Sequence, residues 1–308
     1  MTDKIKTAAV FPGQGSQFVG MGRDLYEKYE SVRVLFERAA GILGFDLASR
    51  CFEGPADELN QTRVTQPAIF VHSVAVYELL RDRGFKADIV AGHSLGEYSA
   101  LVATGCLDFE EGLRLVGRRG SLMQEAGSQA PGTMAAVIGL QGSSLEELCD
   151  QDPGVAVVAN TNCPGQVVIS GEVEAVERVM QSAKGAGAKI AKKLKVSGAF
   201  HSPLMEQARQ DMKSALAEAA FISGNIPVVA NVTAEPETDP EKVRDLLERQ
   251  ITGPVRWQQS VERMAALGVQ RYLELGPGNV LTGLMRRIDR NLEASAVGTL
   301  EQIEGVIL

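Results

Sequence analysis

The chain has 308 residues, of which 44% are hydrophobic, and it carries a net charge of −8 at pH 7. This length and composition predict a globular protein with a large buried core and one to three domains, and the acidic charge argues against nucleic acid as the main partner. With three histidines and four cysteines, none of them in a Cys-x-x-Cys spacing, we expect no metal site and reduced, structural thiols.

Nothing in the sequence directs the chain to a membrane. No stretch approaches the ~20 consecutive apolar residues that a transmembrane helix needs. The opening residues 1–6 are too polar to begin a secretory signal. We therefore expect a cytoplasmic protein with no membrane partner.

The first predicted element is a short apolar strand at residues 7–11, which leads into the loop Pro-Gly-Gln-Gly-Ser-Gln at 12–17. Glycines in such a loop let backbone N–H groups come close to a ligand. The loop has neither the lysine of a P-loop nor a Gly-x-Gly-x-x-Gly pattern that opens a helix, so both nucleotide-binding interpretations fail. The next predicted elements are helices at 22–29, 32–41 and 67–83, followed by a strand at 88–91.

The pentapeptide Gly92-His93-Ser94-Leu95-Gly96 follows that strand and precedes a helix that begins at Glu97. This arrangement is typical of a nucleophile elbow, in which glycines two residues on either side of the serine permit a sharp strand-to-helix turn. The N-terminus of the following helix faces the place where an oxyanion would form. An accidental match to so short a pattern is the alternative, and the position between a strand and a helix disfavours it.

Arg119 lies within the apolar stripe of a predicted helix at 109–126. The stripe consists of Leu115, Val116, Leu122 and Met123, which recur at helical spacing. A buried arginine needs an anionic partner, because an unpaired buried charge costs several kcal/mol. Two interpretations are open: a structural salt bridge, or a guanidinium that binds a ligand carboxylate through two hydrogen bonds.

Residues 134–196 follow the order β-α-β-β-α-β, which is the order of a ferredoxin-like unit. The predicted elements are a strand at 134–140, a helix at 143–150, strands at 155–160 and 166–170, a helix at 173–186 and a strand at 189–196. We therefore predict a small domain at 129–198, inserted into a larger α/β domain made of 1–128 and 199–308. In the last part we expect helices at 203–220, 241–250, 258–267 and 280–290 and strands at 226–232 and 270–275.

His201 is the best candidate for the base that a serine nucleophile needs. His72 lies among apolar residues of a helix, and the chain turn at the elbow should direct His93 away from Ser94. His201 alone sits in a loop, next to a helix that Ser202 and Pro203 can open. A surface histidine without a role is the alternative. No carboxylate stands out as the third member of a triad, so a backbone or amide carbonyl is expected to orient His201.

Together these motifs identify a resemblance that runs along essentially the whole chain. The segments that carry it are Phe11–Gln17 (Phe-Pro-Gly-Gln-Gly-Ser-Gln), Thr65–Ala68 (Thr-Gln-Pro-Ala), Gly92–Tyr98, Arg119-Gly120, Gly198–His201 and Glu274–Pro277. The chain resembles the malonyl-CoA:acyl carrier protein transacylases, the acyltransferase family of fatty-acid and polyketide synthesis. This resemblance implies an α/β-hydrolase-like large domain with an inserted ferredoxin-like small domain, and an active site in the cleft between them.

The resemblance also implies residue roles. Ser94 would be the nucleophile and His201 its partner in a dyad, oriented by a main-chain carbonyl near Gln250. The backbone N–H groups of Gln14 and Leu95 would form the oxyanion hole, and Arg119 would bind the free carboxylate of the substrate. The remaining pocket residues would include His93 and Phe200. A ring at position 200 would crowd a methyl branch on the substrate, so Leu95 and Phe200 look like the malonyl-selective type.

The implied reaction transfers a malonyl group from malonyl-CoA to the pantetheine thiol of acyl carrier protein through a malonyl-serine intermediate, by a ping-pong route without metal or redox cofactor. A serine esterase or thioesterase with the same dyad is the alternative, although it would not need Arg119 and would leave the inserted domain without a purpose. A non-catalytic binding protein would not need Ser94, His201 and Arg119 together. We expect a monomer.

The segment between Glu177 and Glu206 contains six basic residues and no Asp or Glu: Arg178, Lys184, Lys189, Lys192, Lys193 and Lys195. Acyl carrier proteins are acidic, so a basic face would steer the encounter. Since a strand alternates its faces, we expect Lys189, Lys193 and Lys195 to form that face. The alternatives are a solvated edge that guards the strand against aggregation, and a docking site at Arg286-Arg287.

Overall fold

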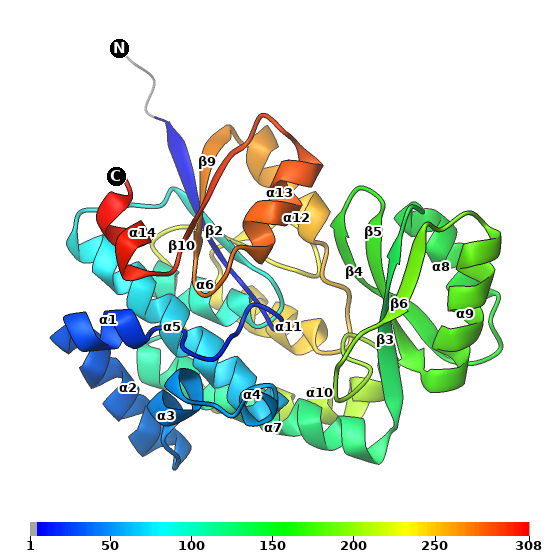
Figure 1. Cartoon of the computed structure of the whole chain (residues 1–308), viewed down its shortest axis with the longest axis horizontal. Helices are drawn as coiled ribbons and strands as arrows, with labels where there is room; N and C mark the ends of the chain where they lie inside the picture. Colours follow the sequence, from blue (N-terminus) through cyan, green and yellow to red (C-terminus); the bar gives the residue numbers. More distant parts are fainter. Residues whose placement is uncertain (1–4, 308) are drawn as a thin grey trace.

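The computed structural model describes residues 5–307, and it contains two β-sheets that lie side by side, each with its own helices (Figure 1). The larger sheet has the strand order β10-β9-β1-β2-β7-β8 and is parallel except for β8. Its strands are β1 (Lys6–Phe11), β2 (Ile89–Gly92), β7 (Val228–Val229), β8 (Pro236–Glu237), β9 (Val269–Leu275) and β10 (Glu293–Val297).

The central strand β1 is apolar from Ala8 to Phe11, as expected for a sheet that helices cover on both faces. Ala9 and Phe11 belong to the core that includes helices α5 (Thr62–Asp82), α6 (Gly96–Thr104) and α7 (Phe109–Gln129). Ala8 and Val10 point the other way, into the core formed with α12 (Trp257–Ala266) and α13 (Val280–Ile288). The larger part is therefore a three-layer α/β arrangement.

The larger part contains further helices (Figure 1). They are α1 (Arg23–Lys28), α2 (Glu30–Leu43), α3 (Leu47–Phe52), α4 (Ala56–Leu59), the 3-10 helix η1 (Pro203–Met205), α10 (Glu206–Glu218), α11 (Pro240–Gln250) and α14 (Leu300–Gly305). Among residues 5–307, no helix has the length and apolar character needed to cross a membrane.

The smaller sheet is antiparallel, with the order β4-β5-β3-β6. Its elements are β3 (Gly132–Ile138), α8 (Gly142–Asp150), β4 (Ala156–Cys163), β5 (Gln166–Glu172), α9 (Val173–Gly185) and β6 (Ile190–Lys193). This is the predicted order β-α-β-β-α-β, and all six elements fall within the segment 129–198. One face of the sheet packs on α8 and α9.

The chain leaves the larger part after α7 and returns at Ser197 and Gly198, and these two crossings touch. A Cβ atom on Gly127 would lie 2.2 Å from the Ser197 carbonyl oxygen, and a Cβ atom on Gly198 would lie 2.8 Å from Gly127 Cα. The two backbones meet where the sequence predicts hinges. The outer limits of the predicted large domain, residues 1 and 308, lie outside the described residues.

Several predicted limits differ from the structure. Helix α5 begins at Thr62 and contains Pro67, which the sequence pattern takes as its start. The strand expected at 226–232 pairs only at Val228–Val229, because the chain then turns back, with Ala234 at φ 58°. The edge strand β10 and the short helices α3, α4 and α14 carry weak periodicity and are absent from the sequence prediction.

Candidate active site

Ser94 lies in the turn between β2 and α6, with φ at 51°. A Cβ atom on Gly92 would lie 1.9 Å from the carbonyl carbon of Gly96, and one on Gly96 would lie 2.1 Å from the carbonyl oxygen of Phe11. Neither position therefore accepts a side chain, which is the constraint that defines a nucleophile elbow. The turn stands at the carboxyl ends of the parallel strands, where open α/β sheets bind their ligands.

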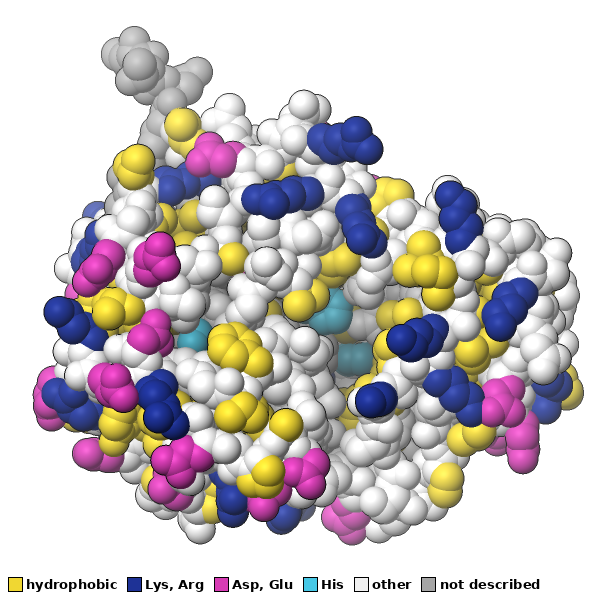
Figure 2. All heavy atoms as spheres, viewed as in Figure 1, with side chains coloured by type: hydrophobic (Ala, Val, Ile, Leu, Met, Phe, Trp, Pro, Cys, Tyr) yellow, Lys and Arg dark blue, Asp and Glu magenta, His cyan; other side chains and the backbone are white. Residues whose placement is uncertain are grey.

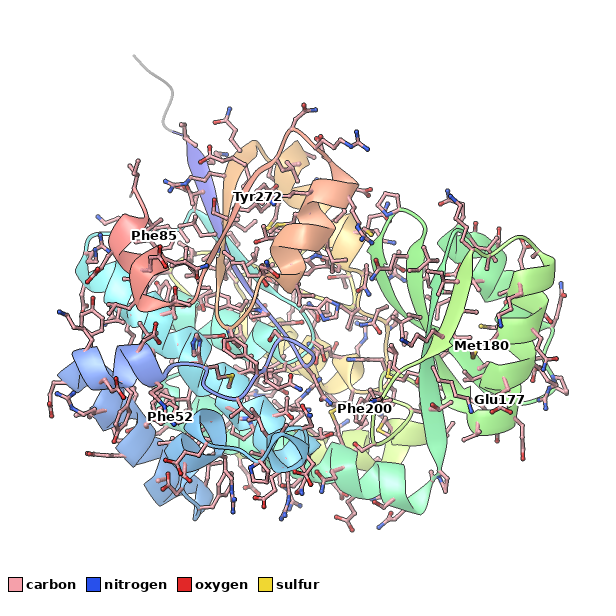
Figure 3. The ribbon with its side chains drawn as sticks, in the orientation of Figure 1. Phe52, Phe85, Glu177, Met180, Phe200 and Tyr272 are labelled. Carbon is pink, nitrogen blue, oxygen red and sulfur yellow. The ribbon has the colours of Figure 1, made fainter. Side chains whose placement is uncertain are left out.

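A cavity of about 200 Å³ opens above Ser94, between the two sheets. The larger part contributes residues such as Gln14 and Leu95, and the smaller sheet contributes residues such as Asn162 and Val168. Figure 2 shows the hollow between the two parts, with histidine side chains in cyan inside it. Phe200 lies where the chain returns from the smaller sheet, and its side chain lines the cavity (Figure 3).

The His201 ring connects Ser94 to two backbone carbonyls. Its Nε2 lies 2.8 Å from Ser94 Oγ, and its Nδ1 lies 2.9 Å from the Gln250 carbonyl oxygen and 3.1 Å from that of Gly253. Carbonyl oxygens only accept hydrogen bonds, so Nδ1 carries the proton and Nε2 is free to accept the proton of Ser94. This geometry is that of a Ser-His dyad oriented by the main chain.

The loop that carries His201 is held by its neighbours. Ser202 Oγ donates to the Ala199 carbonyl at 2.6 Å and accepts from Leu204 N–H at 3.3 Å, so it caps η1. His201 itself has φ at 58°, a conformation that a non-glycine residue adopts only when its surroundings impose it. Ser202 and Pro203 therefore fix the loop that holds the His201 ring. The sequence pattern before the helix predicts this role for them.

Burial and, after it, the nearby charge of Arg119 lower the pKa of His201 to about 3, although the hydrogen bonds to the Gln250 and Gly253 carbonyls act in the opposite direction. His201 is therefore neutral throughout the physiological pH range and ready to accept a proton.

Arg119 is 1% exposed and points from α7 to the serine. Its Nη2 donates to Ser94 Oγ at 3.0 Å and to Gln250 Oε1 at 2.9 Å, and its Nη1 donates to Gln66 Oε1 at 2.9 Å. No ion pair within residues 5–307 includes Arg119, and its buried Nε has no hydrogen-bond partner there. Arg119 therefore makes no direct salt bridge within the described residues, and the buried Glu97, whose charge raises the pKa of Arg119, lies on the other side of the Gln250 amide.

Two residues of the cavity wall have backbone N–H groups without an acceptor in the part of the chain that the structure describes. The amides of Ser94, Gly96 and Gly15 all donate to oxygens of the protein. Between residues 5 and 307, the N–H groups of Gln14 and Leu95 have no such acceptor, and both residues line the cavity. The resemblance assigns these two N–H groups to an oxyanion hole.

The sequence predictions left out several polar residues of the site. His93 points away from the serine as expected, and its Nε2 lies 2.9 Å from Asn162 Oδ1 on β4. Asn160 and Asn162 both line the cavity from β4, but the strand predicted at 155–160 ends before Asn162, so the sequence did not indicate their shared polar face. Asn231 accepts the Ser94 N–H at 2.7 Å, but nothing in its sequence context signals that role.

The three lysines predicted to dock a carrier are exposed, but they do not share the cavity side of the smaller sheet. Lys193 forms an ion pair with Glu177 on α9, which lies on the outer side of the molecule (Figure 3). The neighbouring residue Lys192 lies on the opposite face of β6. Leu194, two residues further along, lies on that same face and lines the cavity.

The site contains a serine in an elbow turn and a neutral histidine at hydrogen-bond distance from it. A buried guanidinium lies beside the same serine. These features are typical of an enzyme of the acyl-transfer class, in which a serine holds the acyl group. Residues 9–302 match the family model described as "Acyl transferase domain". The chain belongs to this acyltransferase family.

Its relatives carry more specific names. It is 48% identical to the malonyl CoA-acyl carrier protein transacylase of Escherichia coli strain K12 over 94% of this chain and 95% of the relative. It is 42% identical to the protein of the same name from Bacillus subtilis, over 97% of this chain and 95% of the relative.

Solved structures of similar proteins share this fold. An acyl carrier protein S-malonyltransferase from Vibrio cholerae matches with a TM-score of 0.94 at 45% identity, over 98% of this chain and 100% of that one. A malonyl-transacylase in complex with a type II PKS acyl-carrier protein matches with a TM-score of 0.94 at 43% identity, over 97% of this chain and 98% of that one.

The lowered pKa of His201 predicts an unusual pH profile. Because the neutral base persists as the pH falls, the rate at which Ser94 reacts with a fluorophosphonate probe should stay level from about pH 8 to about pH 5. An ordinary histidine would lose activity around its usual pKa near 6.5. A half-maximal rate between about pH 6 and pH 7 would contradict this account of the site.

Proposed function

We propose that this protein transfers a malonyl group from malonyl-CoA to the pantetheine thiol of acyl carrier protein, through an ester on Ser94. The observation that carries the proposal is Arg119, a buried cation that makes no direct ion pair within residues 5–307 and donates to the oxygen of the dyad serine. A guanidinium so placed favours an acyl group with a free carboxylate at its far end. The names of the relatives support the same substrate.

In the first half-reaction His201 Nε2 takes the proton of Ser94, and Oγ attacks the thioester carbonyl of malonyl-CoA. The developing oxyanion accepts hydrogen bonds from the N–H groups of Gln14 and Leu95. When the intermediate collapses, the carbon-sulfur bond breaks and His201 returns its proton to the departing thiolate of CoA. The malonyl group remains as an ester on the serine.

In the second half-reaction the pantetheine thiol of the carrier enters the same cavity. His201 removes its proton, the sulfur attacks the ester carbonyl, and the proton returns to Ser94 Oγ as the carbon-oxygen bond breaks. No step needs a metal or a redox cofactor. Phe200 on the cavity wall would crowd a branched acyl group, which supports malonyl as the substrate.

We also propose the finer description of the fold: an α/β-hydrolase-like larger domain made of 1–128 and 199–308, with a ferredoxin-like domain inserted at 129–198. The antiparallel order β4-β5-β3-β6 supports the second part. The extender units would serve fatty-acid or polyketide synthesis. Cytoplasmic location and a monomeric state stay predictions.

A serine esterase or thioesterase with the same dyad is the second candidate, and it would hydrolyse the ester instead of passing it on. The buried Arg119 and the relatives favour transfer over hydrolysis. Release of free CoA without acylated carrier, with malonyl-CoA and carrier both present, would support the hydrolase.

Replacement of Arg119 tests the substrate most directly. Arg119→Ala should lower kcat/KM for malonyl transfer about 100-fold or more, because removing one member of a buried ion pair costs ~3 kcal/mol or more. Transfer from acetyl-CoA should fall much less, since acetyl has no carboxylate. Arg119→Lys should recover part of the loss, because lysine keeps the charge without the two-pronged geometry. Equal losses for both acyl groups would count against the carboxylate role.

We propose that the carrier docks on the basic edge around β6, next to the cavity. The exposed side chains of Lys189, Lys192 and Lys195 support this, and Figure 2 shows Lys and Arg side chains along the rim of the hollow. Because Lys193 is already paired with Glu177, Lys192 should contribute more than Lys193 to steering an acidic carrier.

Charge reversal separates these lysines. Lys192→Glu should raise the apparent KM for the carrier several-fold and weaken its salt dependence, while malonyl-serine formation from malonyl-CoA stays unchanged. Lys193→Glu, the matched control, should change the carrier KM less. If neither variant changes the carrier kinetics, the docking site lies elsewhere, and Arg286-Arg287 on α13 are the next residues to reverse.

A further inference from the structure

A buried carboxylate that the proposed reaction does not use lies directly behind the dyad. Glu97 is the second residue of α6 and is 2% exposed. Its Oε2 accepts a hydrogen bond from Gln250 Nε2 at 2.8 Å and another from the Asn231 backbone N–H at 3.0 Å. Burying a carboxylate is costly, so this placement calls for a physical reason.

The first partner of Glu97 contacts both catalytic neighbours of the serine. Gln250 accepts the His201 Nδ1 proton with its backbone oxygen and the Arg119 guanidinium with its side-chain Oε1. This requires that the amide point Oε1 toward Arg119 and Nε2 away from it. Nε2 in turn donates to Glu97 and, at 3.0 Å, to the Ser94 carbonyl. Glu97 therefore favours the one amide orientation that suits Arg119.

The second partner holds the serine turn. The Asn231 side chain accepts the Ser94 N–H at 2.7 Å and donates to the Gly92 carbonyl at 2.6 Å. Its own backbone N–H is fixed by Glu97. One carboxylate oxygen thus connects the elbow on one side with the arginine and histidine on the other.

We propose that Glu97 is a positioning residue, which acts as a hydrogen-bond acceptor to Gln250 and Asn231 and so sets the placement of Ser94, His201 and Arg119 relative to one another. Both donors converge on Oε2, an oxygen that accepts whether the group is a carboxylate or a carboxylic acid. Burial raises the pKa of Glu97 to about 7, so a role that both protonation states perform suits it. This inference rests on the proposed function.

Two substitutions separate the acceptor from its charge. Glu97→Gln keeps an acceptor oxygen at the same reach and removes the charge, whereas Glu97→Asp keeps the charge and withdraws the oxygen by about 1.5 Å. Misplacement on that scale costs up to ~100-fold in rate. Three quantities are measured for each folded variant: kcat and KM with malonyl-CoA, the malonyl-to-acetyl preference, and the rate at which Ser94 reacts with a fluorophosphonate probe.

We expect Glu97→Asp to lose about ten-fold or more in kcat and in probe reactivity and to show a weaker malonyl preference, while Glu97→Gln stays within about three-fold of the parent. Glu97→Met has a side chain of similar size without an acceptor oxygen, so it should behave like Glu97→Asp. It takes the place of Glu97→Asp if that variant does not fold. Glu78→Asp is the matched control, since this half-buried carboxylate lies three turns beyond Gln66 on α5, and it should change nothing.

Parental rates in Glu97→Asp or Glu97→Met would overturn the proposal, because they would leave Glu97 a structural role only. A glutamine variant as impaired as the aspartate variant would also overturn it, since the charge would then matter and not the acceptor. The probe reaction needs no malonyl-CoA, so it tests the positioning role even if malonyl transfer itself were absent from the parent protein.

Discussion

The site depends on one electrostatic constraint: a guanidinium is buried beside the nucleophile without a direct ion pair to any carboxylate of the described chain. Burial lowers the pKa of Arg119, and the nearby Tyr98 and Glu97 offset this only in part. The same charge helps to hold His201 neutral. A ligand carboxylate that binds Arg119 therefore offsets the free-energy cost of burying the guanidinium charge. This binding energy comes from the end of the acyl group farthest from the thioester.

The backbone supplies the rest of the geometry. Close approaches at Gly92 and Gly96 fix the serine turn, and the contact between Gly127 and Ser197 brings the loop of His201 back to the larger part. Residues from both sheets thus surround one cavity (Figure 2). The nucleophile belongs to the parallel sheet, and the base enters on the segment that leaves the antiparallel one.

Much of this arrangement could be predicted from the sequence, because it depends on local patterns. The elbow follows from two glycines around a serine, and the buried face of Arg119 follows from helical spacing. By contrast, Asn231 and the amide of Gln250 act through contacts between residues far apart in the chain, which no local pattern encodes. The carrier-docking face stays a prediction: alternation indicates which lysines share a side of β6, but the ion pair of Lys193 with Glu177 on α9 appears only in the structure.

The central claim is that Ser94 carries the acyl group, and the mass of the intact protein tests it most directly. After brief mixing with malonyl-CoA, the parent protein should gain one malonyl group, which disappears when acyl carrier protein is added. Ser94→Ala should gain none, while His201→Ala should acquire the group ~100- to 10,000-fold more slowly. A malonyl adduct of unchanged yield in Ser94→Ala would contradict the account.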